Sequence, residues 1–348
     1  MSTQQALWLP GIGQDFAVGT KEIDAPGPGE LLVKIISSGL NPLDWKIQEN
    51  GFIQFVKSYP AVIGEEAAGN VEAVGEGVTD FKEGDRVFFQ ASLNMGSKFT
   101  TFQQYCIVIA DSAAKIPDHT SFDQAASVQV GIIPFVVALY AQQPEGLAHL
   151  APWLEGGNGK YAGQPILIMG GASTLGQYAI QLARLSGFSP IITTASFHNT
   201  ELLSSLGATH VLDRKLSTTA LKDAIAKITS IPIILAFDAI SLPDTQQTAH
   251  DIVTAGGTVI TVRVPQVDNK HEDKVVQQVV GSFHIPPNRE LGKSFMPALT
   301  QWLADGTIKP NAIEVVPGGL NGVSSGLQRL KNNLVSGKKL VVRPWETA

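Results

Sequence analysis

The residues best suited to chemistry lie in a glycine-rich stretch near the middle of the chain. Gly170 and Gly171 follow the apolar run Ile166–Met169, and a helical pattern begins at Leu175. An apolar strand that ends in glycines before a helix surrounds an anion with backbone N–H groups and the positive end of the helix dipole. The stretch therefore predicts a site for the pyrophosphate of a dinucleotide.

The glycine pattern departs from the common dinucleotide fingerprint at one position. It reads Gly-x-Ser-x-x-Gly from Gly171 to Gly176, with Ser173 in place of the middle glycine. Gly171 permits the turn and Gly176 permits close packing of the helix on the strand, while the hydroxyls of Ser173 and Thr174 can contact phosphate. Leu175 stands where a nucleophile elbow requires glycine, which argues against a serine hydrolase. The alternative is a strand–helix turn that binds no ligand.

The end of the second strand in this region predicts which dinucleotide binds. NAD sites usually place a carboxylate there, which accepts hydrogen bonds from the ribose hydroxyls and would repel a 2′-phosphate. In this chain Ser196, His198 and Asn199 occupy the place, and no acid occurs before Glu201. These side chains can donate to a phosphate, and Arg214 adds positive charge after the third strand. We therefore favour NADP(H), although Asn199 alternatively acts as a helix cap alone.

The elements that must position these residues indicate an α/β protein in two parts. Short β-type runs separated by glycine and proline predict an all-β unit in roughly the first 120 residues. A helical pattern begins at Ser121. From Pro165 to Val262, strands alternate with helices, which is typical of a doubly wound parallel sheet with right-handed crossovers. Further helical and strand patterns follow to the end of the chain.

Composition argues against several other classes of protein. The chain has 348 residues, 44% hydrophobic, and a net charge of −6, which fits two globular domains and gives no reason to expect nucleic acid or a membrane surface. The single cysteine, Cys106, excludes an internal disulfide. No signal-peptide pattern is present, and the longest apolar run, Val130–Ala141, is too short to cross a bilayer. We expect a cytoplasmic protein.

Five motifs in the same order resemble the medium-chain dehydrogenase/reductase superfamily over nearly the whole chain. They are Asn41–Lys46 (NPLDWK), Gly64–Gly69 (GEEAAG), Gly84–Val87 (GDRV), Gly171–Gly176 and Ser336–Val341 (SGKKLV). The first motif, together with the sequence SFHN at 196–199, is similar to a fungal branch that includes trans-enoyl reductases and zinc-binding-dehydrogenase homologues. The resemblance implies a GroES-like β domain at residues 1–122 and 300–348 and a Rossmann domain at residues 123–299.

The resemblance also bears on metal and reaction. Zinc-dependent members have a cysteine and a histidine at the positions of Asn41 and Glu65, and a third ligand near Gln129. Because catalytic zinc needs three protein ligands, we expect no metal. Without that Lewis acid, alcohol oxidation is disfavoured, and zinc-free members typically reduce an activated C=C bond or a quinone. We expect reduction of an α,β-unsaturated carbonyl compound or enoyl thioester, and the alternatives are a quinone reductase and a non-catalytic NADPH-binding partner or sensor.

Lys46 is the catalytic candidate that the resemblance implies. It lies in the motif that faces the nicotinamide in relatives, where an ammonium group can stabilise an enolate or donate a proton. The alternative is a structural lysine that binds cofactor phosphate or pairs with Asp44 or Glu66. Tyr59 and Tyr105 are weaker candidates for the proton donor.

The resemblance places further residues around the cofactor and the substrate. Those expected to contact the cofactor, besides the glycine loop and the residues around Ser196, are Asp44, Trp45, Lys46, Val262, Val335 and Ser336. Those expected to line the substrate pocket are Val130, Ile132, Ile133 and Phe283. Such an apolar wall suits an acyl or alkyl chain, and plain helix core is the alternative. We expect a small-molecule or carrier-bound acyl substrate and a monomer or a homodimer.

Overall fold

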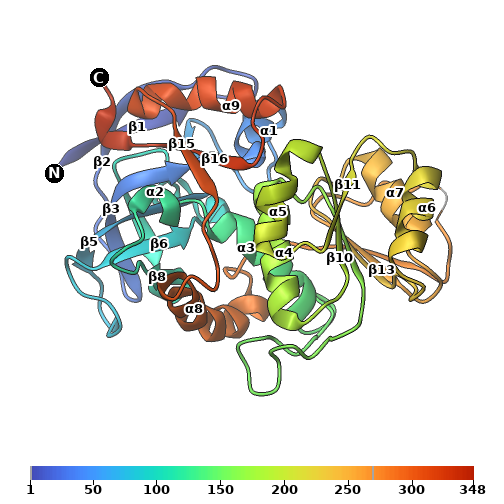
Figure 1. Cartoon of the computed structure of the whole chain (residues 1–348). Coiled ribbons are helices and arrows are strands. Elements are labelled where there is room, and N and C mark those ends of the chain that lie inside the picture. The colour runs from blue at the N-terminus through green and yellow to red at the C-terminus, as the bar shows by residue number, and fades with distance from the viewer. Residues whose placement is uncertain (1, 269) are drawn as a thin grey trace. The chain divides into compact units, whose positions relative to one another are not determined.

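The structure is a computed structural model that describes residues 2–268 and 270–348 (Figure 1). The chain divides into two compact units. The first unit runs to Val130 and resumes as Gly292–Ala348, and the second is Gly131–Leu291. The sequence places the domain boundaries after residues 122 and 299. In the structure the units change after residues 130 and 291, eight residues later and eight residues earlier.

The first unit contains two sheets. The larger has seven strands in the order β15-β16-β3-β5-β6-β8, with β7 paired to β3, and the smaller has the order β2-β1-β4. The strands are β1 (Thr3–Leu9), β2 (Ala17–Glu22), β3 (Glu30–Gly39), β4 (Ala61–Val62), β5 (Glu66–Val74), β6 (Arg86–Gln90), β7 (Tyr105–Ile109), β8 (Ala113–Lys115), β15 (Ala312–Val315) and β16 (Lys338–Val342). The helices are α1 (Pro42–Asn50), α2 (Phe122–Ala125), α8 (Arg289–Ala304) and α9 (Val323–Lys331).

Both ends of the chain build this first unit. Figure 1 shows the C-terminal elements α9, β15 and β16, in red, among the N-terminal strands, in blue. The connection is a strand pairing, because β16 runs antiparallel to β3 with Val341 opposite Gly39 and Val342 opposite Ser38. Strands from the two chain ends therefore belong to one sheet.

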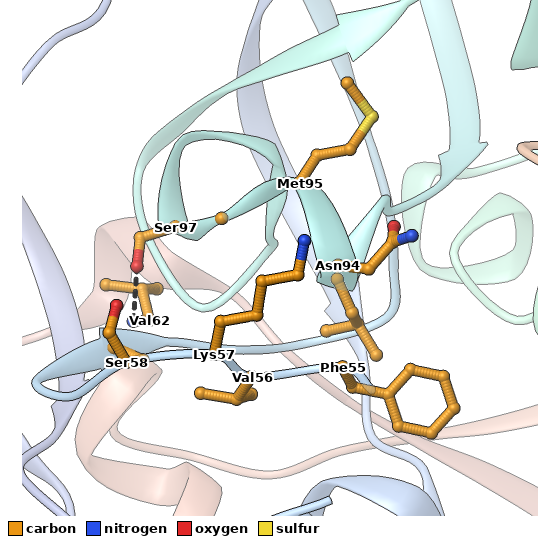
Figure 2. A pocket seen from close by; sticks show the side chains of 11 residues that line it. Phe55, Val56, Lys57, Ser58, Val62, Asn94, Met95 and Ser97 are labelled. Carbon is orange, nitrogen blue, oxygen red and sulfur yellow. Dashed lines mark hydrogen bonds between the residues drawn. The ribbon is translucent and has the colours of Figure 1, made fainter. Parts of the chain in front are cut away.

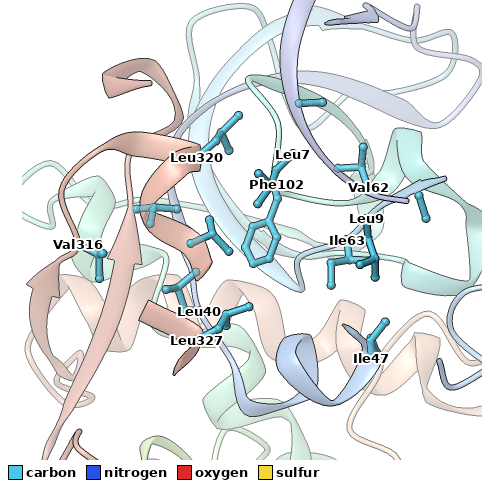
Figure 3. Packing of buried hydrophobic residues seen from close by; sticks show 14 of the residues in the cluster. Leu7, Leu9, Leu40, Ile47, Val62, Ile63, Phe102, Val316, Leu320 and Leu327 are labelled. Atoms are coloured by element: carbon cyan, nitrogen blue, oxygen red, sulfur yellow. The ribbon is translucent and has the colours of Figure 1, made fainter. Parts of the chain in front are cut away.

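Alternating burial explains why β3 occupies the middle of the larger sheet. Leu31, Val33 and Ile35 point into one core and the residues between them are partly exposed, which is the period of two that a half-buried strand requires. A second core fixes helix α1. Ile47 of α1 packs with Leu40, Phe102 and other apolar side chains of β1, β4 and α9 (Figure 3), so the loop and first turn that carry the NPLDWK motif are held in place.

The second unit is a six-stranded parallel sheet with helices between the strands. The strands have the order β11-β10-β9-β12-β13-β14 and the bounds β9 (Ile166–Met169), β10 (Ile191–Ala195), β11 (His210–Asp213), β12 (Leu235–Asp238), β13 (Thr258–Thr261) and β14 (Val275–Gln278). The helices are α3 (Gln129–Tyr140, starting in the first unit), α4 (Thr174–Ser186), α5 (Thr200–Leu206), α6 (Thr218–Ile228) and α7 (Pro243–Ile252). The strand order reverses between β9 and β12, which is where doubly wound sheets bind ligands. The predicted doubly wound sheet is confirmed.

Two local differences from the sequence expectations have simple causes. The apolar stretch 231–237 predicts a strand, but β12 begins only at Leu235, because Pro232 has no N–H for the ladder and Ile231 is 50% exposed. The apolar run at 130–141 overlaps the stretch Phe122–Tyr140, the one stretch among the described residues that is long and apolar enough to cross a membrane. Since 72% of its most apolar window is buried inside the protein, it has the burial of a core helix.

Candidate functional site

The glycine loop lies at the carboxyl end of β9, as predicted. Gly170 has a φ of +77°, which favours glycine, and its N–H donates to Thr194 Oγ1 at 3.0 Å. Ser173 caps α4, its hydroxyl oxygen accepting a hydrogen bond from the N–H of Gly176 at 3.0 Å. The Ser173 hydroxyl proton can still be donated to a ligand. Ser173 therefore combines the capping role with the predicted phosphate contact.

The loop packs so tightly that side chains do not fit at two of its glycines. A Cβ on Gly171 would lie 2.1 Å from Thr193 Oγ1, and a Cβ on Gly176 would lie 2.3 Å from the carbonyl oxygen of Gly170. The first N–H groups of a helix have no partner inside it. With Gly176 bonded to Ser173, the N–H groups of Thr174 and Leu175 are left to bind an anion. This geometry fits the pyrophosphate of a dinucleotide.

The predicted 2′-phosphate residues gather at the end of β10. Ser196 is half-buried and His198 is exposed, and a hydrogen bond of 3.0 Å from the N–H of Arg214 to the carbonyl of Ala195 holds the arginine beside them. Asn199 precedes α5 without a side-chain capping bond, and its amide lies 3.2 Å from His198 Nε2. The structure thus brings polar and basic groups to this strand end.

Two acidic residues near this sheet edge were missed from the sequence. Asp213 pairs in register with Ala195, and its carboxylate accepts the N–H of Lys215 at 3.0 Å. Asp238 ends β12, where it accepts the N–H groups of Ile240 and Ser241 at 3.0 and 2.8 Å. Desolvation raises the pKa of Asp238 above its usual range. Acids directly after apolar strands were the signal that could have found both.

Asp238 shapes the loop that borders the glycines. Its second carboxylate oxygen accepts the hydroxyl of Thr245 at 2.7 Å. A Cβ on Gly170 would meet Ile240 at 2.3 Å, so this loop lies directly on the glycine turn. Ser241 in turn accepts the N–H of the predicted cofactor residue Val262 at 2.9 Å, which ties the ends of β12 and β13 together.

The first unit contains a buried ionic cluster around the NPLDWK motif. Lys339 of β16 donates to Asn41 Oδ1 at 2.6 Å and to Glu66 Oε1 at 2.5 Å. The other Glu66 oxygen accepts the N–H of Val130 at 2.9 Å, and Asp44 accepts the N–H of Asn41 at 2.8 Å. Lys339 and Glu66 are 3% and 1% exposed. Residues almost 300 positions apart in the sequence therefore meet in one desolvated site.

Burial controls the protonation of the two remaining acids of this cluster. Desolvation raises the pKa of Asp44 from 3.8 to about 8, outweighing the hydrogen bond from Asn41 and the charge of Lys339. Desolvation, and next the nearby Asp44, raise the pKa of Glu65 well above its usual value. One oxygen of each, Asp44 Oδ1 and Glu65 Oε1, is buried with no hydrogen-bond partner among the described residues. Burial therefore favours the protonated form of both carboxyl groups.

Lys46, the predicted catalytic residue, lies beside this cluster. Its ammonium group is 5.6 Å from the centre of the Trp45 ring, and its charge lowers the pKa of Glu65, an effect smaller than the desolvation that raises it. Trp45 packs on the apolar cluster around α1. Val335 is half-buried and Ser336 is exposed, both in the turn before β16. The contacts of these residues with a cofactor stay predictions.

Three of the four predicted substrate-pocket residues are buried, and the fourth is half-buried. Ile132, Ile133 and Phe283 are buried in the second unit, and Val130 is half-buried in the first. Packing alone therefore explains the first three, and their contact with substrate stays a prediction. The two tyrosine candidates pack in the first unit, where Tyr59 donates to the carbonyl of Gly51 and Tyr105 stands edge-on to Trp345.

A separate cavity in the first unit lies between two loops. It has a volume of about 260 Å³ and is walled by Phe55–Ser58 on one side and Leu93–Ser97 on the other (Figure 2). The side chain of Lys57 extends along it. None of the four predicted pocket residues lines it.

A parallel sheet that reverses its strand order at a glycine loop defines a dinucleotide-binding fold of the Rossmann class. Comparison with known proteins extends this result to the whole chain. Residues 27–118 match the model of the alcohol dehydrogenase GroES-like domain, and residues 174–287 match that of the zinc-binding dehydrogenases. The chain belongs to the medium-chain dehydrogenase/reductase superfamily, a family of oxidoreductases.

Individual relatives are similar over almost their whole length. The chain is 31% identical to the trans-enoyl reductase resD of Aspergillus sclerotiorum, with 97% of this chain and 99% of that protein covered. It is 31% identical to the trans-enoyl reductase himH of Aspergillus japonicus, at 97% and 96% coverage.

Solved structures share the fold. A quinone oxidoreductase from Pseudomonas syringae pv. Tomato DC3000 has a TM-score of 0.79 at 22% identity, with 98% and 100% of the chains covered. A variant of the crotonyl-CoA carboxylase/reductase AntE in complex with NADP has a TM-score of 0.75 at 17% identity, with 98% and 95% covered.

The zinc that one family name implies does not fit the residues of this chain. Asn41 Oδ1 accepts from the Lys339 ammonium group, whose charge would repel a cation. The Gln129 amide nitrogen donates to the carbonyl groups of Phe88 and Ser112 at 3.1 and 3.3 Å. No group of three histidine, cysteine or acidic side chains within residues 2–268 and 270–348 is arranged to hold a metal ion. The donor set of catalytic zinc is therefore missing from this part of the chain.

Proposed function

We propose that the protein is an NADPH-dependent, metal-independent reductase of the C=C bond in α,β-unsaturated carbonyl compounds or enoyl thioesters. The observation that carries the proposal is the helix α4 N-terminus, with Ser196 and Arg214 held at the neighbouring strand end. The chain's relatives include trans-enoyl reductases, which supports the same reaction. The substrate is a small molecule or an acyl group on a carrier, and the proposed location is the cytoplasm.

Each part of the proposed site has a physical role. The N–H groups at the start of α4 bind the pyrophosphate, and the hydroxyl of Ser196 and the guanidinium group of Arg214 bind the 2′-phosphate. When bound, the reduced nicotinamide supplies a hydride to the β-carbon of the substrate. The resulting enolate needs positive charge or a hydrogen-bond donor at its oxygen, which Lys46 provides, and then a proton at its α-carbon.

The first test follows NADPH oxidation by absorbance. An aliphatic enone or enal, a quinone and a saturated aldehyde are each offered with NADPH, with NADH and with a chelator. We expect chelator-resistant turnover of the enone with NADPH. Turnover of the quinone alone would instead support a quinone reductase, the activity for which the Pseudomonas syringae structure is named. No turnover of any substrate, together with thermal stabilisation by NADPH, would leave a carrier-bound substrate or a non-catalytic NADPH-binding protein.

A further inference from the structure

We propose that the cavity between the loops 55–58 and 93–97 binds a small amphiphilic anion, an alkyl chain of medium length that ends in a carboxylate. The lining of this cavity comes from the first unit alone, and it includes none of the residues assigned to the proposed reaction. The inference therefore goes beyond the proposed function and does not rest on it. Its basis is the size of the cavity, the chemistry of the lining and the charge at the rim.

The cavity has an apolar floor and a polar rim. Val56 and Val62 line it from the buried side and belong to an apolar core of the first unit. Lys57, Ser58 and Asn94 line it from the exposed side. An apolar base with a few well-placed polar groups is the usual form of a small-molecule site. This arrangement suits a ligand with one apolar end and one polar end.

The volume of the cavity limits the size of its ligand. At about 260 Å³, the cavity is larger than an apolar cavity of about 150 Å³, which is enough to bind benzene. It is slightly smaller than the pockets of about 300–1,000 Å³ that bind drug-sized molecules. An alkyl carboxylate of medium length, such as octanoate, lies between these two sizes.

The charge of the lining favours an anion. Of the eleven residues that line the cavity, Lys57 alone has a charged side chain. Figure 2 shows this side chain reaching from its own loop toward the loop that contains Asn94. Within the described part of the chain, the Lys57 ammonium group makes no hydrogen bond and no ion pair. A cavity with one unpaired ammonium group and no carboxylate in its lining has the positive potential that an anionic ligand requires.

Two neutral side chains of the lining can also donate hydrogen bonds to an anion. The hydroxyl oxygen of Ser97 accepts the N–H of Val62 at 3.0 Å, and its own proton can be donated to a ligand. The amide of Asn94 has no hydrogen-bond partner among the described residues, and it offers two N–H donors. Hydrogen bonds from a charged donor are roughly twice as strong as those from a neutral one. We therefore expect Lys57 to contribute most to the binding of the anionic group.

Buried hydrogen bonds fix the wall that contains Ser97. Gln103, which is 0% exposed, donates to the carbonyl oxygens of Ser97 and Thr100 at 2.7 and 2.8 Å. The hydroxyl of Thr100 donates to the carbonyl of Val62 at 2.9 Å, which ties this wall to the floor of the cavity. A wall that is already ordered lowers the entropic cost of binding a ligand.

Isothermal titration calorimetry of the full chain with three probes tests the proposal. Octanoate has both the chain and the anionic group, 1-octanol has the chain alone, and inorganic phosphate is an anion without a chain. We expect octanoate to bind at one site, about tenfold more tightly than either of the other probes.

Lys57→Met removes the charge and keeps the apolar stem of the side chain. This variant should bind octanoate about tenfold more weakly than the wild type and should bind 1-octanol as the wild type does. Lys98→Met is the matched control, because Lys98 pairs with Glu30 and does not line the cavity. The control should keep the wild-type affinity for octanoate.

A further variant and the wild-type comparison complete the test. Met95 lines the cavity and is 47% exposed, so Met95→Ala should keep the melting temperature and weaken the binding of octanoate by about threefold through lost apolar contact. Equal affinity of the wild type for octanoate and 1-octanol would overturn the anion site, whatever the variants show. Equal octanoate binding by Lys57→Met and Lys98→Met would also overturn it, as would a wild-type protein that binds no octanoate.

Discussion

Substituting Lys339 by methionine tests the idea that one ammonium group makes the buried cluster possible. The Lys339 amine makes two hydrogen bonds, to Asn41 and Glu66, and both members of the ion pair are almost fully buried. Removing one partner of such a pair leaves the other charge uncompensated, which typically destabilises a protein by about 3–5 kcal/mol. That loss is a large part of a total stability of about 5–15 kcal/mol. We expect Lys339→Met to lose stability in this range at neutral pH.

The assay is urea unfolding followed by tryptophan fluorescence. This signal reports mainly on the first unit, since four of the five tryptophans lie there, namely Trp8, Trp45, Trp302 and Trp345. Lys338→Met is the matched control, because Lys338 is the neighbouring lysine and makes a half-exposed ion pair with Glu314. Exposed ion pairs contribute about 0–1 kcal/mol. The control should therefore unfold close to the wild type.

Two further outcomes follow from the same reasoning. Adding Glu66→Gln to Lys339→Met removes the stranded carboxylate and should restore part of the lost stability. Acidification should also narrow the difference between Lys339→Met and the wild type, because protonation neutralises the uncompensated acids. Equal losses for Lys339→Met and Lys338→Met, or no recovery in the double variant, would refute the view that Lys339 compensates buried negative charge.

The remaining predictions concern the dinucleotide site and pH. Ser196→Asp places a carboxylate against the 2′-phosphate and should weaken the binding of NADPH by about 10–100-fold relative to that of NADH in a binding titration, equivalent to about 1.4–2.8 kcal/mol. An unchanged ratio of the two dissociation constants would contradict the NADP(H) assignment. Gly176→Ala brings a Cβ to 2.3 Å from the Gly170 carbonyl oxygen, so NADPH should no longer stabilise this variant in a thermal-shift assay. The control is Gly256→Ala, at an open position with positive φ, which NADPH should still stabilise. The raised pKa of Asp44 means that the folded state binds the proton more tightly, so stability should fall as pH rises from about 4 to about 8, and Asp44→Asn should flatten this slope in urea unfolding.

Local patterns were enough to predict most elements of the second unit. The sequence pattern predicts a helix at 218–228, and α6 has these bounds. Ser217 caps this helix and its apolar positions recur with the helical period. The glycine loop was located from Gly171 and Gly176 alone, since strand, turn and helix follow one another there without interruption. The strand predicted at 231–237 is shorter in the structure and begins at Leu235. The apolar run favoured the longer strand, but Pro232 has no N–H for the sheet.

The buried cluster could not be predicted in the same way, because it depends on contacts between distant segments. Within the NPLDWK motif, Asp44 follows Asn41 by three residues and accepts the hydrogen bond from its N–H. Nothing in the neighbourhood of Asp44 in sequence shows that Lys339 arrives beside it through the pairing of β16 with β3. Desolvation is likewise a property of the folded unit, so the raised pKa values of Asp44 and Glu65 could not be predicted from their residue types.

The composition of the cluster suggests how a member of this superfamily can work without a Lewis acid. A metal ion would stabilise developing negative charge directly, but Lys339 places an ammonium group against Asn41 and Glu66 where a cation would be repelled. Burial in the same cluster raises the pKa of Glu65. Hydride addition to a C=C bond needs a proton at carbon and, unlike alcohol oxidation, does not need a metal-bound alkoxide. The cluster lacks the ligand set of catalytic zinc, which supports the proposed reduction of an activated double bond over metal-dependent alcohol oxidation.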